Sequence, residues 1–141
     1  FEKAEYVEER IRQLCGDGFR VERVYIEQSL QSFRSGFSSA KTLSTLSRFN
    51  GIVSWMVYRN LHQEPQYIAA TSARKLCGIK VPRGAKAKEI VLQHLKTTEP
   101  VFKIEYTKFN NPKPECYDKA DSIIIAKAGH ALCQKQKKEK S

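Results

Sequence analysis

The chain has 141 residues, which is enough for one domain with a hydrophobic core. Lysine and arginine number 25 against 15 aspartates and glutamates, and the net charge of +10 favours a polyanionic partner such as nucleic acid, or else only a basic surface. No apolar run approaches the roughly 20 residues of a membrane span, and none has the pattern of a signal peptide, so we expect a soluble protein without a membrane partner.

The first predicted elements are a helix and a strand. Ala4, Val7, Ile11 and Leu14 recur at helical spacing over residues 4–15. A strand over residues 21–28 follows, and it ends on Glu27. A carboxylate beside a core is costly without a partner or a metal, so Glu27 is either a solvated strand end or part of a site.

A second helix is predicted over residues 40–61, where apolar residues again share one face. Gly51 lies inside this helix and costs about 1 kcal/mol relative to alanine. We expect that the glycine permits a close approach to a neighbouring element.

The second half of the chain alternates in the same way. The expected order is a strand at 66–71, a basic loop at 72–84, a helix at 85–95, a strand or hairpin arm at 100–109, a loop at 110–115 and a helix at 117–133. Such alternation predicts an α/β fold, with helices packed on a mixed central sheet and strand 21–28 near the middle of the sheet. We expect one domain over residues 1–134 and a solvated basic tail over residues 135–141.

Three carboxylates could carry chemistry. Asp118 and Asp121 are spaced by three, so they share a face of the final helix, near its start. Helix capping alone would explain them about equally well, because aspartate is common at helix starts. Together with Glu27 they form the set of oxygen ligands that Mg²⁺ takes in two-metal phosphodiester hydrolysis. The isolated cysteines and histidines predict reduced thiols and no zinc site.

Four motifs resemble one known family. "YIEQSLQ", "RFNGIV", "GAKAKEIV" and "YDKADSIIIAKAGH" are similar to segments of the RuvC-type Holliday junction resolvases, within the ribonuclease H-like superfamily. The resemblance covers residues 4–133, and its most specific part is Glu-Gln at a strand end followed much later by Asp-x-x-Asp-Ser. It implies a ribonuclease H-like mixed sheet flanked by helices.

The resemblance also implies roles for individual residues. Glu27, Asp118 and Asp121 would bind Mg²⁺, or alternatively Mn²⁺, and Lys88 would complete the catalytic group, with Lys86 as the other candidate. Basic side chains would meet the phosphates of a four-way DNA junction, although a solvated basic surface explains them about as well. These residues are Arg34, Lys41, Arg74, Lys75, Arg83 and Lys86.

The sequence departs from the family in two places. Family members begin with a strand that carries a further aspartate, followed by two more strands, and these do not precede Phe1 here. Either the native N-terminus is missing from this chain, or this relative has lost the strand and with it normal catalysis. The segment 97–115 is longer than the family's link into the last helix, and is either a hairpin that serves a partner or a surface loop.

Two functions follow as expectations. The first is a magnesium-dependent endonuclease that resolves four-way DNA junctions by paired nicks as a homodimer, which the resemblance implies. The alternative is an inactive module that binds DNA or structured RNA through its phosphates, and a nuclease acting on other nucleic acids ranks below both. We expect a mitochondrial protein from the family's eukaryotic branch, with nucleus, plastid and bacterial cytoplasm as the other locations.

Overall fold

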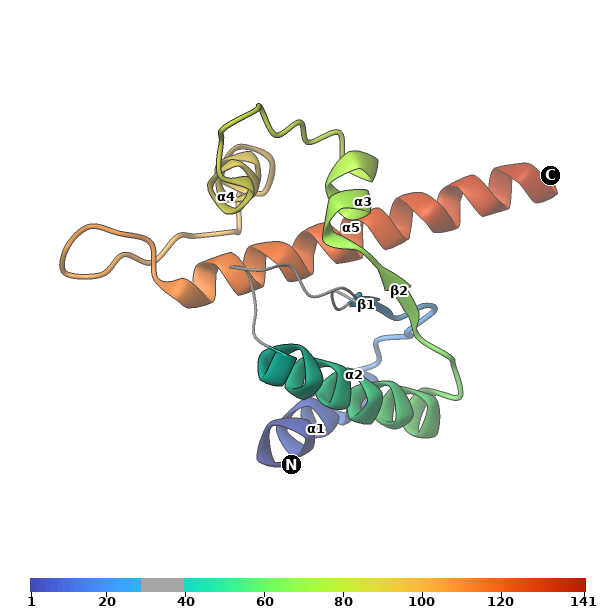
Figure 1. The fold of residues 1–141 in the computed structure, drawn as a ribbon. Helices are drawn as coiled ribbons and strands as arrows, with labels where there is room; N and C mark the ends of the chain where they lie inside the picture. Colours follow the sequence, from blue (N-terminus) through green and yellow to red (C-terminus); the bar gives the residue numbers. More distant parts are fainter. Residues whose placement is uncertain (29–39) are drawn as a thin grey trace. The chain divides into compact units, whose positions relative to one another are not determined.

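The computed structural model describes residues 1–28 and 40–141, which belong to two compact units, Phe1–Tyr67 and Ile68–Ser141 (Figure 1). The first unit contains helix α1 (Glu2–Gly16), strand β1 (Tyr25–Glu27) and helix α2 (Ala40–Leu61). Strand β2 (Gln66–Ile68) leads from it into the second unit. The second unit contains helices α3 (Ala70–Leu76), α4 (Ala87–Thr98) and α5 (Pro114–Lys140). Helices thus dominate the described part of the chain.

The first unit is built on the packing of α1 against α2. Ala4 on α1 and Met56 and Val57 on α2 are buried. Asn60 on α2 donates a hydrogen bond from Nδ2 to Oε1 of Glu8 on α1, at 2.8 Å. A small apolar contact and a polar bond between side chains therefore hold the two helices together.

The predicted mixed central sheet is wrong. In the described residues the sheet consists of two parallel strands, β1 and β2, joined in part by the bond from Gln66 N to Val24 O at 2.9 Å. Strand β1 has three residues and lies beside one neighbour, so it is not a central strand of a ribonuclease H-like sheet. Such a short pair cannot form the apolar layer on which helices pack in an α/β fold.

The segment predicted as a strand at 100–109 forms no strand either. Its alternating residues Phe102 and Ile104 are half-buried, but the segment has no strand neighbour in the described residues beyond one isolated bridge, between Tyr106 and Pro112. The alternating pattern therefore predicts that Phe102 and Ile104 are partly buried. It does not predict a strand, because a strand also needs a neighbouring backbone to hydrogen-bond with.

The second unit is organised around α5, against which α3 and α4 both pack (Figure 1). Leu92 and Leu95 on α4 and Ile124 on α5 are buried. An ion pair between Lys127 and Glu99 links α5 to the end of α4. The Cys77 thiol, at the end of α3, donates to the Ile124 carbonyl at 3.6 Å. Three helices of one unit are thus fixed relative to each other.

Helix α3 replaces the first part of the predicted basic loop at 72–84, up to Leu76. Alanine, leucine, lysine and arginine are strong helix formers, and "ATSARKL" consists mostly of these. The helix ends where Gly78 adopts φ +72, the left-handed conformation that glycine commonly supplies after a helix. The basic composition of the segment concealed its helical propensity.

Two further expectations are corrected. A side chain added at Gly51 would meet no atom within 4 Å, so this glycine permits no close approach among the described residues. Helix α5 begins at Pro114, a residue favoured at the first helical position, and continues to Lys140 through most of the predicted tail. None of the described helices has both the length and the apolar character that crossing a membrane requires.

Candidate functional site

The candidate site lies on α5, where Asp118 and Asp121 occupy neighbouring turns of one face. Asp118 is exposed and Asp121 is half-buried. Because the helix begins at Pro114, the acidic residue of its first turn is Glu115, and both aspartates lie beyond that turn. Stabilisation by the helix dipole fades after the first turn. Capping, the alternative explanation of the pair, therefore does not account for their positions.

Asp121 has an electrostatically unusual environment. Burial raises the pKa of its carboxyl above the ordinary value, and the nearby Asp118 raises it further. Lys88 and Arg74 act on the same pKa in the opposite direction. Burial disfavours the ionised form of this carboxyl, so the ionised Asp121 lowers the stability of the fold. Such a cost is common at functional sites.

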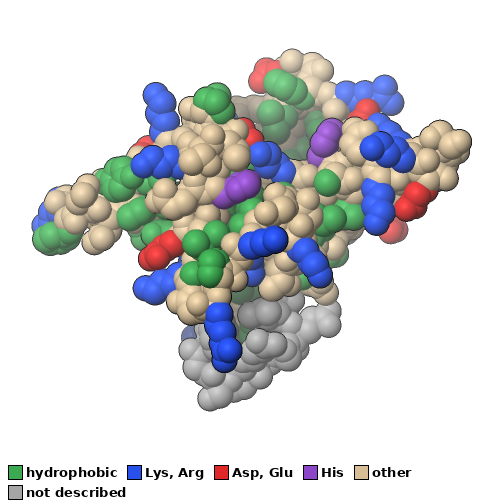
Figure 2. All heavy atoms as spheres, turned by 90° about the horizontal axis from the view of Figure 1, so that it is seen from above, with side chains coloured by type: hydrophobic (Ala, Val, Ile, Leu, Met, Phe, Trp, Pro, Cys, Tyr) green, Lys and Arg blue, Asp and Glu red, His purple; other side chains and the backbone are tan. Residues whose placement is uncertain are grey.

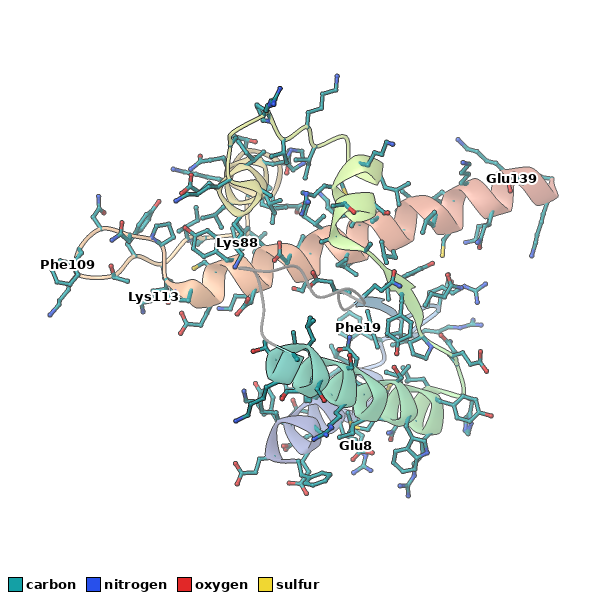
Figure 3. The ribbon with its side chains drawn as sticks, viewed as in Figure 1. Glu8, Phe19, Lys88, Phe109, Lys113 and Glu139 are labelled. Carbon is teal, nitrogen blue, oxygen red and sulfur yellow. The ribbon has the colours of Figure 1, made fainter. Side chains whose placement is uncertain are left out.

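Two cations from different helices face this carboxylate. Lys88 is in the first turn of α4 and points towards α5 (Figure 3), and Arg74 is in the last turn of α3. A cation near a helix N-terminus opposes the helix dipole, so helix stability does not explain Lys88. Neither aspartate forms a hydrogen bond or an ion pair within 4 Å with any residue in the described ranges, which leaves their oxygens available to a ligand.

Glu27 belongs to the other unit. It ends β1, its side chain is exposed, and its carbonyl accepts a hydrogen bond from Asn50 Nδ2 on α2 at 3.2 Å. Across residues 1–28 and 40–141, no three His, Cys, Asp or Glu side chains gather as a metal site. The expectation that Glu27 joins the two aspartates stays a prediction.

The remaining predicted phosphate contacts are dispersed. Lys75, Arg83 and Lys86 are exposed residues of the second unit, and Lys41 is exposed at the start of α2. Arg34 lies outside the described residues. Lys and Arg side chains are spread over the face shown in Figure 2, with fewer acidic ones between them. The surface suits a polyanion, but its lysines and arginines do not mark one narrow path.

A hairpin-like turn lies at residues 105–113, just before α5, within the segment for which the sequence predicted a strand or hairpin arm followed by a loop. The bridge between Tyr106 and Pro112 closes it, and Phe109 lies at its exposed tip. The asparagine and proline residues of "NNP" signal a turn, but the sequence did not reveal what the turn presents.

No family model, no curated protein and no solved structure matches this chain. The resemblance to the junction resolvases therefore depends on the four motifs alone.

Proposed function

We propose that this protein is a divalent-metal-dependent endonuclease of nucleic acid, with Asp118 and Asp121 as metal ligands. One observation carries the proposal. Two carboxylates on one face of α5 lie beyond the turn where they would stabilise the helix, and Lys88 and Arg74 act electrostatically on the half-buried one, Asp121. Adjacent anionic and cationic groups are what a site needs to hold both a metal ion and a phosphate.

The two aspartates fit Mg²⁺ in one respect. This ion is commonly held by one or two carboxylates, with waters and substrate phosphates as its other ligands. Asp118 is exposed and has carboxylate oxygens that can accept such an ion, while Asp121 is held by the helix packing around it. Bound Mg²⁺ would supply an activated water and neutralise charge on the phosphate.

The cations have a separate role in the proposal. Lys88 and Arg74 can bind the non-bridging oxygens of a phosphodiester and stabilise the negative charge that grows during hydrolysis. Because both extend from helices that pack on α5, their charges act on Asp121 before substrate arrives. Glu27 remains a proposed third ligand, and this role depends on the motif resemblance.

The substrate class also depends on that resemblance. We propose a four-way DNA junction, nicked in pairs by two copies of the chain. The net charge of +10 supports a nucleic-acid substrate of some kind, because phosphate neutralisation dominates such binding.

A second function is favoured because, among the described residues, no third His, Cys, Asp or Glu side chain joins Asp118 and Asp121 in a group that could hold a metal ion. With only two acidic ligands, this surface could bind nucleic acid without cutting it. Affinity would then fall steeply with salt and would not require a divalent ion.

Cleavage of a labelled four-way junction by the full-length protein with Mg²⁺ tests the proposal. Asp118→Asn should lower the rate by about 100-fold or more. Glu139→Gln is the matched control, because it removes one exposed carboxylate from the far end of the same helix and should leave cleavage unchanged. Tight binding without cleavage in the unaltered protein would favour the second function, and cleavage equal in the two variants would remove Asp118 from the site.

A further inference from the structure

The turn at residues 105–113 is held by a network of local hydrogen bonds. Thr107 N donates to Asn111 O at 2.7 Å, and Asn110 N donates to Thr107 O at 2.9 Å. The Thr107 hydroxyl accepts two more bonds, from the backbone of Phe109 and of Asn111. Asn110 adopts φ 62, a conformation that asparagine tolerates better than most residues. The tip therefore has one defined shape.

The base of this turn is fastened to α5. Lys113 N donates to Glu105 O at 2.8 Å, and the side chains of the two residues form an ion pair at 3.3 Å. The buried Cys116 sulfur, in the first turn of α5, accepts a hydrogen bond from Glu105 N and contacts Glu105 O. The turn is thus bonded directly to the start of α5, the helix that carries Asp118 and Asp121.

This rigid turn exposes an aromatic ring. Phe109 is 74% exposed, and it lies at the end of the loop that leads to Lys113 (Figure 3). The Lys108 ammonium lies over the ring, 5.1 Å from its centroid. Large apolar side chains gain free energy from burial, so a fixed and exposed phenyl ring contributes little to the fold. Its placement suits a partner that covers it.

The charges around the ring indicate which partner. The two acidic residues of the stretch 99–113 are each paired within the unit, Glu99 with Lys127 and Glu105 with Lys113. Lys103 and Lys108 form no ion pair with any described residue, and both are exposed. An exposed aromatic ring with an unneutralised lysine against it fits nucleic acid, because a base can stack on the ring while a phosphate meets the ammonium group.

We propose that Phe109 stacks on an unpaired or unstacked base of a nucleic-acid branch, with Lys108 on the adjoining phosphate and the exposed Lys103 adding positive charge to the same segment. The inference rests on the proposed function, since it requires a nucleic-acid partner. Duplex DNA keeps its bases stacked on each other, whereas a branch point offers base faces to which the ring can bind. The turn thereby selects branched over linear substrate beside the aspartates of α5.

The test uses a four-way junction with 2-aminopurine at the branch and a linear duplex of the same sequence, in EDTA to prevent cleavage. Phe109→Ala should weaken junction binding by about 5- to 150-fold, as expected for one lost stacked base. It should also relieve the quenching of 2-aminopurine and leave duplex affinity unchanged. Phe109→Trp should restore both junction signals. Val101→Ala is the matched control, because Val101 is an apolar residue of the same connection and is 90% exposed.

The outcomes separate this inference from the proposed function. Junction binding and quenching that are equal in Phe109→Ala and the unaltered protein would overturn the stacking role and assign the tip to a different kind of partner. The endonuclease proposal would stand in that case, because Asp118→Asn tests it independently. No binding of the unaltered protein to either DNA would overturn both.

Discussion

The two units differ in how much of their apolar surface they bury. Among the described residues of the first unit, the buried apolar ones are Ala4, Met56 and Val57, whereas Trp55 and Tyr58 on α2 are more than half exposed. In the second unit α4 and α5 each contribute several fully buried side chains. The aspartates of the candidate site therefore lie on the better-packed unit. Glu27, the third proposed ligand, lies on a three-residue strand in the less-packed one.

The largest expected effect comes from removing a core side chain of the second unit. Leu95 is fully buried, so Leu95→Ala should lower the free energy of unfolding by about 2–5 kcal/mol. Leu46, on α2 of the first unit, is 48% exposed, and Leu46→Ala should cost less than about 1 kcal/mol. Urea unfolding followed by circular dichroism measures both. Equal losses would contradict the difference in packing between the units.

The same contrast explains what the sequence could predict. Helices at 2–16 and 40–61 were predicted within a few residues, because apolar periodicity and glycine or proline at helix ends are local signals. The sheet was predicted wrongly, because a strand is defined by its partner, and alternation at Phe102 and Ile104 does not identify one.

For the site, the sequence singled out the two aspartates, Lys88 and Arg74, all four of which interact electrostatically in the second unit. Their spacing and the motif resemblance were sufficient for this. The helix boundary was not predicted, and it is the boundary at Pro114 that separates a capping role from a site role. The base of the 105–113 turn is bonded through Glu105 to Cys116, a residue that spacing alone presented as an isolated thiol.

A smaller effect is expected from glycines in the two units. Gly51 lies inside α2 with nothing within 4 Å of an added Cβ, so Gly51→Ala should raise the free energy of unfolding by about 0.5–1 kcal/mol. Gly78 in the second unit has φ +72, and Gly78→Ala should instead lower it by about 1 kcal/mol. Thermal unfolding of both variants checks the opposite signs. A loss of stability in Gly51→Ala would restore the close approach that we first expected there.

The smallest expected effect is a difference in stability between two acidic residues of α5. Asp121 belongs to the candidate site, whereas Glu115 stabilises the fold. The pKa of Asp121 is raised in the folded state, mainly by burial, so the folded protein binds this proton more tightly than the unfolded chain does. The resulting stability is complete below the ordinary aspartate pKa and is lost as pH rises through the raised folded pKa. At neutral pH, Asp121→Asn should therefore increase stability by a few tenths of a kcal/mol, since the side chain is half-exposed and its charge is screened.

Glu115 provides the opposite sign on the same helix. It lies in the first turn of α5, where a negative charge favours the helix dipole, so Glu115→Gln should lower stability at neutral pH by a few tenths of a kcal/mol. Urea unfolding in EDTA at pH 3 and pH 7 measures both variants, and the gain from Asp121→Asn should disappear at the lower pH. If Asp121→Asn destabilised the protein at pH 7, the carboxylate would contribute to the fold. Asp121 would then not be a residue that lowers the stability of α5 in order to bind a ligand.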